Sequence, residues 1–538
     1  MRASPVATNQ KTAMTPLPDA ANDAIADEFQ ITIDLLEAIA ADRTLLERLS
    51  PQERERLHQA VAKVYHPDPI LRRQKIKAAE RARSAAQIER QEALLNATGI
   101  RELRRKPVFS TPNVFPPEGF VQDDGEELEP EIREAIEPKH CYVCKQKYSL
   151  IHPFYDQMCP ACGDFNFAKR TETADLRGRV ALLTGGRVKI GYQAGLKLLR
   201  AGASLIVTTR FPRDSAARYA AEPDFANWAD RLEIFGLDLR HTPSVEAFCH
   251  ELLTTRDRLD FIVNNACQTV RRPPEFYAHM MEGETAPLSD VPQHVRGLLG
   301  KYSGLRRYSM LPENDSGESA VAPLRAAADL LATDLPGIAR AAEMSQVALL
   351  AEELAGQQHL FPQGRLDQDM QQVDLRERNS WRLRLAEVSS VELLEVQLVN
   401  AIAPFLINAR LKPLMLRTPE RDKHIVNVSA VEGQFYRRFK TTRHPHTNMA
   451  KAALNMMTRT SAADYHADGI HMNAVDTGWV TDEDPAALAA RKVIEERFHP
   501  PLDIVDGAAR IVDPIINGRN TGEHVWGLFL KDYKPTDW

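Results

Sequence analysis

Residues 180–191 read Val-Ala-Leu-Leu-Thr-Gly-Gly-Arg-Val-Lys-Ile-Gly, an apolar run followed at once by a glycine-rich turn. An apolar run of this length predicts a buried strand, and glycine lets the backbone turn tightly into a helix. The amino end of such a helix can receive a pyrophosphate, whose charge the helix dipole stabilises. The stretch therefore predicts a nucleotide site that includes Thr184, Gly185, Arg187, Lys189, Ile190 and Gly191.

Outward from this turn, short apolar runs alternate with helical segments. The predicted strands are Val180–Thr184, Ser204–Thr209, Leu232–Leu237, Leu259–Asn264, His424–Val428, His471–Val475 and Val525–Leu530. This alternation predicts an α/β fold, a Rossmann-type doubly wound parallel sheet with right-handed crossovers. Residues from about 271 to 390 contain helix-like stretches and no convincing strand. We therefore expect a domain over 176–538 that is interrupted by a large helical insertion.

Three further regions are expected ahead of the sheet. Residues 1–25 are rich in Ala, Pro, Thr and Asn, which is typical of a disordered terminus. Residues 26–137 carry apolar side chains at helical spacing and helix-start signals such as Ser50–Glu53, so they predict an α-helical region and a linker. Residues 138–170 form a compact module that holds four of the six cysteines.

The spacing of these cysteines predicts a zinc-binding module. Cys141-x2-Cys144 and Cys159-x2-Cys162 are separated by 14 residues, so each pair can direct two thiolates at one tetrahedral Zn²⁺. The chain has no apolar export signal, which favours metal over disulfides. Four thiolates leave no position for water, so we expect structural Zn²⁺; a redox dithiol is the competing interpretation. Gly163 is expected to permit a tight turn under the metal.

The composition is that of an ordinary globular protein. Its 538 residues include 68 basic and 74 acidic side chains, a net charge of −6, so no global field favours nucleic acid or an anionic membrane. No run of about 18 apolar residues predicts a membrane helix. We expect a cytoplasmic protein with a small-molecule substrate. A nucleic-acid-binding role for the cysteine module has little support from this charge balance.

The glycine turn and several later motifs resemble, in the same order, the short-chain dehydrogenase/reductase family. The family's turn reads Thr-Gly-x-x-x-Gly-x-Gly, and its fourth strand ends in Asn-Asn-Ala-Gly, here Asn264-Asn265-Ala266-Cys267. The other matches are Asp238 with Leu239 after the third strand, Asn400 in Val-Asn-Ala, Ser429 in Ile425–Ser429, Lys451 before two alanines, and Asn473–Gly478. The resemblance covers about 178–270 and 391–538.

The resemblance implies an oxidoreductase that moves a hydride between a nicotinamide cofactor and a carbonyl or alcohol carbon. It implies that Asp238, Leu239, Asn265 and Ala266 contact the cofactor. It further implies that Asn400 holds a proton-relay water, that Lys451 binds the nicotinamide ribose, and that the chain forms a homo-oligomer.

The residues at the end of the second predicted strand indicate whether the cofactor is NAD or NADP(H). An acid there would bind a free ribose and repel a 2′-phosphate, but this chain has Thr208-Thr209-Arg210, with Arg213 nearby and Arg187 in the turn. These arginines favour NADP(H) over NAD. The alternative is that Arg210 is a surface cation and that NAD binds.

The chain departs from the family at the glycine turn and at the serine. Lys189 replaces the middle glycine, where its Cβ would crowd a pyrophosphate while its ammonium could offset phosphate charge. Ser429 lies one residue before the slot of the catalytic serine, which is Ala430, and adjacent strand residues face opposite sides.

The tyrosine of Tyr-x-x-x-Lys is also replaced, by Thr447, four residues before Lys451. An aliphatic hydroxyl cannot be tuned for proton transfer as a phenol can, so Thr447 is not an equivalent acid. We expect the proton donor in the segment just before it, with Tyr436 as first candidate and His444 and His446 as the others.

The loop Tyr436–His446 contains four cationic side chains and no acid. It predicts a cationic lip that suits an anionic substrate, such as a carboxylate or a phosphorylated compound. Ion pairing with the acidic segment Thr481–Asp484 is the alternative. The leading interpretation of the whole chain is an NADP(H)-dependent oxidoreductase with an altered catalytic centre. The other is a catalytically degenerate NADP(H)-binding sensor or scaffold, which the loss of serine and tyrosine favours and the retention of Asn400 and Lys451 opposes.

Overall fold

The computed structural model describes residues 19–65, 83, 85–109, 111, 133–299, 340–354, 356–436 and 440–538. The chain divides into two compact units, with the boundary after Glu89. The first unit contains helix α1 (Asp19–Ala41), the 3-10 turn η1 (Arg43–Arg48) and helix α2 (Pro51–Tyr65). Most of the predicted disordered segment, 1–25, lies outside the described residues, as does the middle of the insertion.

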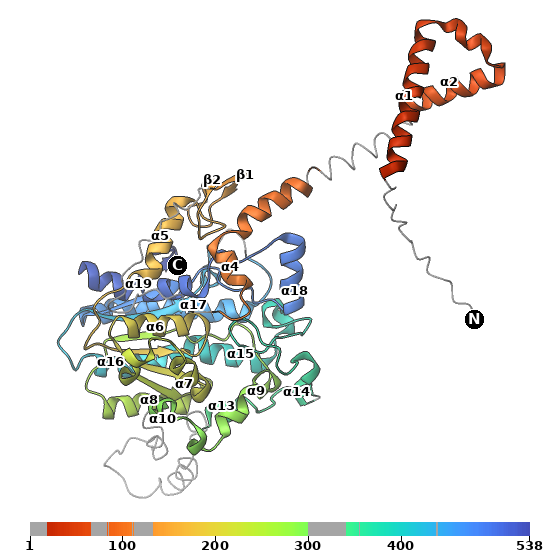
Figure 1. Ribbon diagram of the computed structural model, residues 1–538. Helices are drawn as coiled ribbons and strands as arrows, with labels where there is room; N and C mark the ends of the chain where they lie inside the picture. The colour runs from red at the N-terminus through yellow and green to blue at the C-terminus, as the bar shows by residue number, and fades with distance from the viewer. Residues whose placement is uncertain are drawn as a thin grey trace, which may run out of the picture. The chain divides into compact units, whose positions relative to one another are not determined.

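The second unit is built on an eight-stranded sheet (Figure 1). Its order is β5-β4-β3-β6-β7-β8-β9-β10, and all neighbours are parallel except β9 and β10. The strands are β3 Val180–Thr184, β4 Ser204–Thr209, β5 Leu232–Gly236, β6 Phe261–Asn264, β7 Lys423–Ser429, β8 Ile470–Asp476, β9 Phe529–Lys531 and β10 Lys534–Thr536. The predicted doubly wound sheet is confirmed; only the antiparallel strand β10 was not expected.

Helices cover both faces of this sheet, because successive strand residues point to opposite sides. Leu183 packs into one apolar core with α6 (Lys189–Arg200) and α19 (Ile504–Thr521). Leu182 packs into the other core with α8 (Thr242–Thr255), α16 (Ala403–Met415) and α17 (Pro445–Ala467). The strand order reverses between β3 and β6, and ligands of open α/β sheets bind at such a switch point.

The described part of the insertion consists of short helices and turns joined by irregular segments, with one isolated antiparallel bridge between Leu366 and Gln372. No named strand of the described residues lies between β6 and β7. Its helical elements and turns are α9 Pro274–Thr285, η4 Leu288–Asp290, α10 Gln293–Arg296, η5 Gly297–Leu299, α13 Ala341–Met344, α14 Ala351–Leu354, η7 Gln358–Leu360, η8 Ser380–Arg382 and η9 Leu385–Glu387. Helix α15 (Ser390–Gln397) and the π-helical turn η10 (Leu398–Ile402) then run into α16. The remaining elements are α7 Pro212–Ala220, η2 Phe225–Asn227, η3 Ala229–Arg231, η11 Val431–Gly433, α18 Ala486–Arg491 and the π-helical turn η12 Lys492–Glu496.

The cysteine module precedes the sheet and packs on it. Strands β1 (Arg133–His140) and β2 (Lys147–Ile151) pair antiparallel, and helix α5 (Pro160–Thr171) follows; the sequence did not predict the two strands. Figure 1 shows the module beside α4 (Gly99–Arg105), whose Ile100 N donates to Phe154 O at 2.9 Å. The module shares an apolar cluster with Leu502 and Val505, so it is docked at the amino end of α19.

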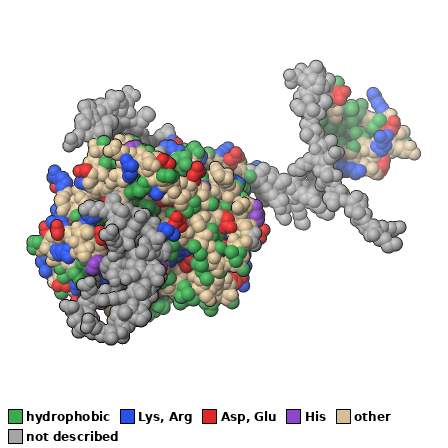
Figure 2. Space-filling view, turned by 90° about the horizontal axis from the view of Figure 1, so that it is seen from below, with side chains coloured by type: hydrophobic (Ala, Val, Ile, Leu, Met, Phe, Trp, Pro, Cys, Tyr) green, Lys and Arg blue, Asp and Glu red, His purple; other side chains and the backbone are tan. Residues whose placement is uncertain are grey.

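Surface charge and helix hydropathy show whether the protein has features of membrane binding or of a membrane-spanning helix. Acidic and basic side chains are interspersed on the face drawn in Figure 2, as the balanced composition predicts. By length and composition alone, the continuous helix Ser390–Met415 could cross a membrane, but half of its apolar window is buried inside the protein, as in a core helix. This is weak evidence for a membrane span.

Four histidines gather near the amino ends of β7 and β8. His424 Nε2 lies 3.0 Å from His524 Nδ1, the ring of His471 stacks on His524 with centroids 4.8 Å apart, and His466 Nδ1 lies 3.4 Å from His471 Nδ1. Burial, followed by the charge of the neighbouring histidines, lowers the pKa of His424 well below its usual range. Burial also lowers the pKa of His471 and the pKa of His524. The carboxylate of Asp422 opposes both shifts, and the charge of Arg519 lowers the pKa of His524 further.

We expect this cluster to make the fold acid-sensitive. The unfolded chain binds protons on His424, His471 and His524 more readily than the folded chain, so the free energy of unfolding should fall as pH drops through about 6.5. His424→Asn should reduce that fall, as measured by chemical denaturation from neutral to acidic pH. His359→Asn, on the exposed turn η7, is the control. Equal pH slopes for both variants and the wild type would contradict the expectation.

Candidate functional site

The glycine turn is fixed against the end of β6. Gly185 has φ +70°, and a Cβ at this position would lie 2.9 Å from Ala266 Cα, so only glycine fits. Thr184 Oγ1 accepts a hydrogen bond from Ala266 N at 3.0 Å. Asn265 Nδ2 donates to the carbonyl oxygens of Thr184 and Gly185, each at 3.1 Å. The residues present therefore form the close backbone cradle that a pyrophosphate requires.

Lys189 has a left-handed backbone conformation, which glycine adopts more readily than other residues. Its φ is +54°, a left-handed conformation that costs a non-glycine residue roughly 1–3 kcal/mol. Burial lowers the pKa of Lys189, but the carboxylates of Glu483, Asp369 and Asp367 outweigh burial and hold the pKa above its usual value. The side chain is thus a cation at the glycine turn, surrounded by acids from the insertion and from the loop after β8.

One cavity of about 530 Å³ lies at the residues that follow strands β3, β4, β5 and β6. All the predicted cofactor residues line it except Thr184 and Lys451: Gly185, Arg187, Lys189, Ile190, Gly191, Arg210, Asp238, Leu239, Asn265 and Ala266. The insertion contributes Asp367 and Gln371–Asp374, and the loop after β8 contributes Thr481–Asp484. Its volume is in the range of small-molecule sites.

The two arginines considered for phosphate recognition have different surroundings. Arg187 is buried and pairs with Asp214 at 2.7 Å and with Gln371 Oε1 at 2.8 Å. Arg210 donates to Tyr277 Oη at 2.6 Å, and its guanidinium lies 4.7 Å from the centre of that ring. Among the described residues, no carboxylate lies within ion-pair distance of Arg210. Arg210 is therefore the arginine with charge available to a ligand.

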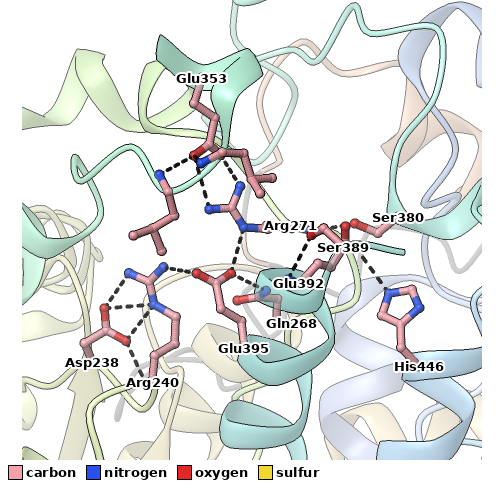
Figure 3. A network of polar contacts seen from close by, with 12 residues as sticks. Asp238, Arg240, Gln268, Arg271, Glu353, Ser380, Ser389, Glu392, Glu395 and His446 are labelled. Carbon is pink, nitrogen blue, oxygen red and sulfur yellow. Dashed lines mark hydrogen bonds and ion pairs between the residues drawn. The ribbon is translucent and has the colours of Figure 1, made fainter. Parts of the chain in front are cut away.

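A network of buried ion pairs lies beside this cavity and was missed by sequence reasoning. Figure 3 shows Arg240 between Asp238 and Glu395, at 2.7 and 2.8 Å, and Arg271 between Glu395 and Glu353. Burial raises the pKa of Asp238, but Arg240 outweighs it and lowers the pKa overall. These partners come from separate segments, so no local motif signals them.

The family's catalytic positions are close-packed and buried. Lys451 Nζ donates to Val428 O at 2.8 Å. Asn400, on the π-helical turn η10, accepts from Gln268 N at 2.7 Å and donates to Gln268 O at 3.2 Å, so its side chain is already hydrogen-bonded. Ser429 Oγ and Thr447 Oγ1 are buried without a hydrogen-bond partner among the described residues. None of these four residues lines the cavity.

The three predicted proton donors lie in different environments. Tyr436, our first candidate, is 91% exposed and lines a second cavity with Trp538, so the structure does not bring it to the buried positions. His444 is buried, stacks on Trp381 with ring centroids 3.9 Å apart, and lies 3.1 Å from Asn448 Oδ1. His446 is buried directly before Thr447. None of the described residues of the loop Tyr436–His446 lines the first cavity.

The four cysteines of the module converge. The sulfur atoms of Cys141, Cys144, Cys159 and Cys162 all lie within 4.8 Å of one another, the arrangement of a four-thiolate metal site. Burial raises the pKa of Cys141, but backbone N–H groups outweigh it and lower the pKa to about 7. One expectation was wrong: Gly163 has no positive φ, and it is required because a Cβ there would lie 2.4 Å from the ring of His152.

The module also contacts the loop that forms one wall of the cavity. Tyr142 Oη accepts a hydrogen bond from Trp479 N at 3.0 Å, and Gln157 Nε2 donates to His499 O at 2.8 Å. Ile190, from the glycine turn, packs against the module's apolar cluster. The module therefore supports two sides of the first cavity.

Comparison with known proteins gives matches on both sides of the insertion. Residues 179–282 match the family model described as short chain dehydrogenase, and residues 375–500 match the one described as Enoyl-(Acyl carrier protein) reductase. A stretch of 433 residues is 28% identical to uncharacterized protein R665 of Acanthamoeba polyphaga mimivirus, covering 78% of this chain and 80% of the viral protein.

A shorter stretch of 105 residues is 34% identical to dehydrogenase/reductase SDR family member 13 of Bos taurus, covering 19% of this chain but only 27% of the bovine protein. Among solved structures, a short-chain dehydrogenase/reductase from Serratia marcescens is similar over 66% of this chain and 96% of its own, with 14% identity and a TM-score of 0.40.

Proposed function

The chain belongs to the short-chain dehydrogenase/reductase family, and on that premise we propose that it transfers a hydride between NADP(H) and a carbonyl or alcohol carbon. The observation that carries the proposal is the cavity at the switch point, lined by the glycine turn, Asp238, Asn265 and Arg210. Its glycine cradle fits a pyrophosphate, because a Cβ at Gly185 or Gly191 would collide with neighbouring atoms.

In this proposal each part of the site has a role. The bound nicotinamide supplies or accepts the hydride. The glycine turn, with Lys189 and the amino end of α6, binds the pyrophosphate, and Asn265 keeps the turn in place. Asn400 fixes the backbone of Gln268 at the cavity wall. Lys451, at the position of the family's lysine, would supply a positive field to the site.

The proposal is tested by mixing purified protein and NADPH with a panel of aldehydes and ketones and following NADPH oxidation. Turnover of any panel member supports it. Tight NADPH binding without turnover of any carbonyl or alcohol would favour the sensor or scaffold instead.

The preference for NADP(H) is tested at Arg210. Arg210→Ala removes a charge-assisted contact to the 2′-phosphate, worth about 1.5–3 kcal/mol. NADPH affinity should therefore fall by roughly ten- to a hundredfold while NADH affinity changes little, as measured by fluorescence titration. Arg213→Ala is the control, because its guanidinium donates to the carbonyl oxygens of Gly283 and Ala286. Equal losses for both cofactors in Arg210→Ala would refute the assignment.

We also propose structural Zn²⁺ at the four cysteines, since four converging thiolates leave no position for water. A cytoplasmic homo-oligomer is proposed as well; exposed apolar side chains of α16 and α17, such as Phe405, Met449 and Met456, support association between copies. The cavity gives no support to an anionic substrate, because the wall formed by Asp482, Glu483 and Asp484 is acidic.

A further inference from the structure

Buried polar atoms without a hydrogen-bond partner occur at Thr447, the position of the family's tyrosine, and at the residue directly before it. Thr447 Oγ1, both ring nitrogens of His446 and, on β7, Ser429 Oγ are buried and have no hydrogen-bond partner among the described residues. Buried polar atoms are nearly always paired, because leaving one unpaired costs free energy. Because two adjacent residues at the start of α17 carry such atoms, this is the place where a polar group of a ligand would complete them.

His446 differs from the two hydroxyls because it has a charged partner. Its Nε2 lies 3.3 Å from Glu392 Oε1, and both side chains are buried. Glu392 belongs to α15, where its backbone N–H donates to Ser389 Oγ at 3.1 Å (Figure 3). A carboxylate at one ring nitrogen orients an imidazole and stabilises its protonated form, which leaves the other nitrogen to exchange a proton.

The charge on Glu392 fits this role. Burial raises the pKa of Glu392, but the neighbouring side chains of His446 and Ser380 outweigh burial and hold the pKa below its usual value. An ionised carboxylate is therefore kept next to the ring in a site where water is largely excluded. Ser380 lies in the insertion, so the insertion contributes to the surroundings of this pair.

The other candidates lack these features. The hydroxyl of Tyr436 belongs to an exposed side chain in a different cavity. His444 lies with Nδ1 3.1 Å from Asn448 Oδ1, and its ring is stacked flat on Trp381. Thr447 is an aliphatic alcohol and cannot supply a proton near neutral pH.

We propose that His446, held by Glu392, is the general acid that replaces the family's tyrosine, an inference that rests on the proposed oxidoreductase function. As a hydride with its electron pair reaches the carbonyl carbon, the Nδ1–H bond of the imidazolium breaks and the proton forms the O–H bond of the alcohol. The substrate gains two electrons, NADPH is oxidised to NADP⁺, and the neutral ring takes up a proton from the bulk solvent once the product has left. In the oxidative direction the neutral ring accepts that proton.

The experiment compares His446→Gln, Glu392→Gln and Tyr436→Phe with the wild type. Turnover of a carbonyl substrate is measured across the neutral pH range, together with NADPH affinity and the thermal midpoint of unfolding. His446→Gln should lower turnover by about a hundredfold or more while NADPH affinity stays within about twofold. Tyr436→Phe, the matched control, should leave turnover unchanged.

Glu392→Gln separates a chemical role from a structural one. It keeps a hydrogen-bonding group of the same size but removes the charge that favours the protonated ring, so the alkaline limb of the pH–turnover profile should move to lower pH. A purely structural pair would lower the thermal midpoint and leave that limb in place. If His446→Gln fails to fold, Glu392→Gln still tests whether the pair acts in the reaction or only stabilises the structure.

The outcomes are distinguishable. Normal turnover by His446→Gln, an unmoved alkaline limb in Glu392→Gln, or loss of turnover in Tyr436→Phe would each overturn the assignment while leaving the oxidoreductase function in place. A wild-type chain that binds NADPH but turns over no carbonyl or alcohol would overturn both.

Discussion

Replacing Cys159 by Ser should cost the chain its zinc and most of its affinity for NADPH. Thiolate–zinc bonding supplies much of the stability of a module this small, so loss of one ligand should unfold it. The module contacts Trp479, which precedes the acidic wall of the cavity in the chain, and His499, which follows it. It is further joined to α19 by Tyr155 Oη, which donates to Asp506 Oδ1 at 2.5 Å, and by Arg170, which pairs with Asp503 at 2.6 Å.

The expected loss of NADPH affinity is about tenfold or more, since ordering the freed loop on binding would cost on the order of 1 kcal/mol for each residue fixed. Metal analysis and fluorescence titration measure the two effects. Cys249→Ala is the control: this cysteine is buried in the core of the sheet domain, away from the module, so zinc content should stay at one per chain. Zinc loss with unchanged NADPH affinity would show that the module does not support the cavity.

Arg271→Leu should lower the free energy of unfolding by about 3–5 kcal/mol. The arginine is buried, and its guanidinium pairs with Glu353 of the insertion and with Glu395 of α15 at 3.0 Å. Its backbone N–H also donates to Ser380 Oγ at 2.7 Å. Removing the cation leaves the buried carboxylates of Glu353 and Glu395 with less opposite charge near them. Because an unpaired buried charge is costly, the free energy of unfolding should fall by this much.

Urea denaturation measures this effect, and Arg177→Leu is the matched control. Arg177 pairs with Asp175 at 2.7 Å, but both side chains are largely exposed, so that variant should leave the free energy of unfolding almost unchanged. Similar unfolding curves for the two variants would mean that the network around Arg271 does not hold the insertion to the sheet domain.

The sequence predicted the sheet well because its strands are buried on both faces. Strands β3 and β4 have the bounds that their apolar runs predict, and β5 to β8 differ from them by one or two residues. Strands β1 and β10 read Arg-Glu-Ala-Ile-Glu-Pro-Lys-His and Lys-Pro-Thr, with largely exposed side chains, so they give no apolar signal. The spacing of the cysteines was sufficient to predict that their four sulfur atoms converge, because two short turns determine where the sulfur atoms point.

The surroundings of the reacting centre were harder to predict. Tyr436 and His446 are both close to Thr447 in the sequence. Helix α17 begins at Pro445, so His446 lies on the helix and is buried, whereas Tyr436 precedes the helix and is exposed. Glu392 and Arg271 have partners 54 and 82 or more residues away in the chain. Contacts of that separation depend on how the insertion folds back, which no local pattern encodes.

The last strand has a consequence for how copies of the protein can meet. Strand β10 turns back antiparallel on β9 and forms one outer edge of the sheet, where it is three residues long and reads Lys534-Pro535-Thr536. Proline has no N–H to offer a neighbouring strand, and a lysine and a short strand further discourage pairing. This edge is therefore protected against strand-by-strand aggregation, and self-association at this side of the molecule would have to use side-chain packing instead of sheet extension.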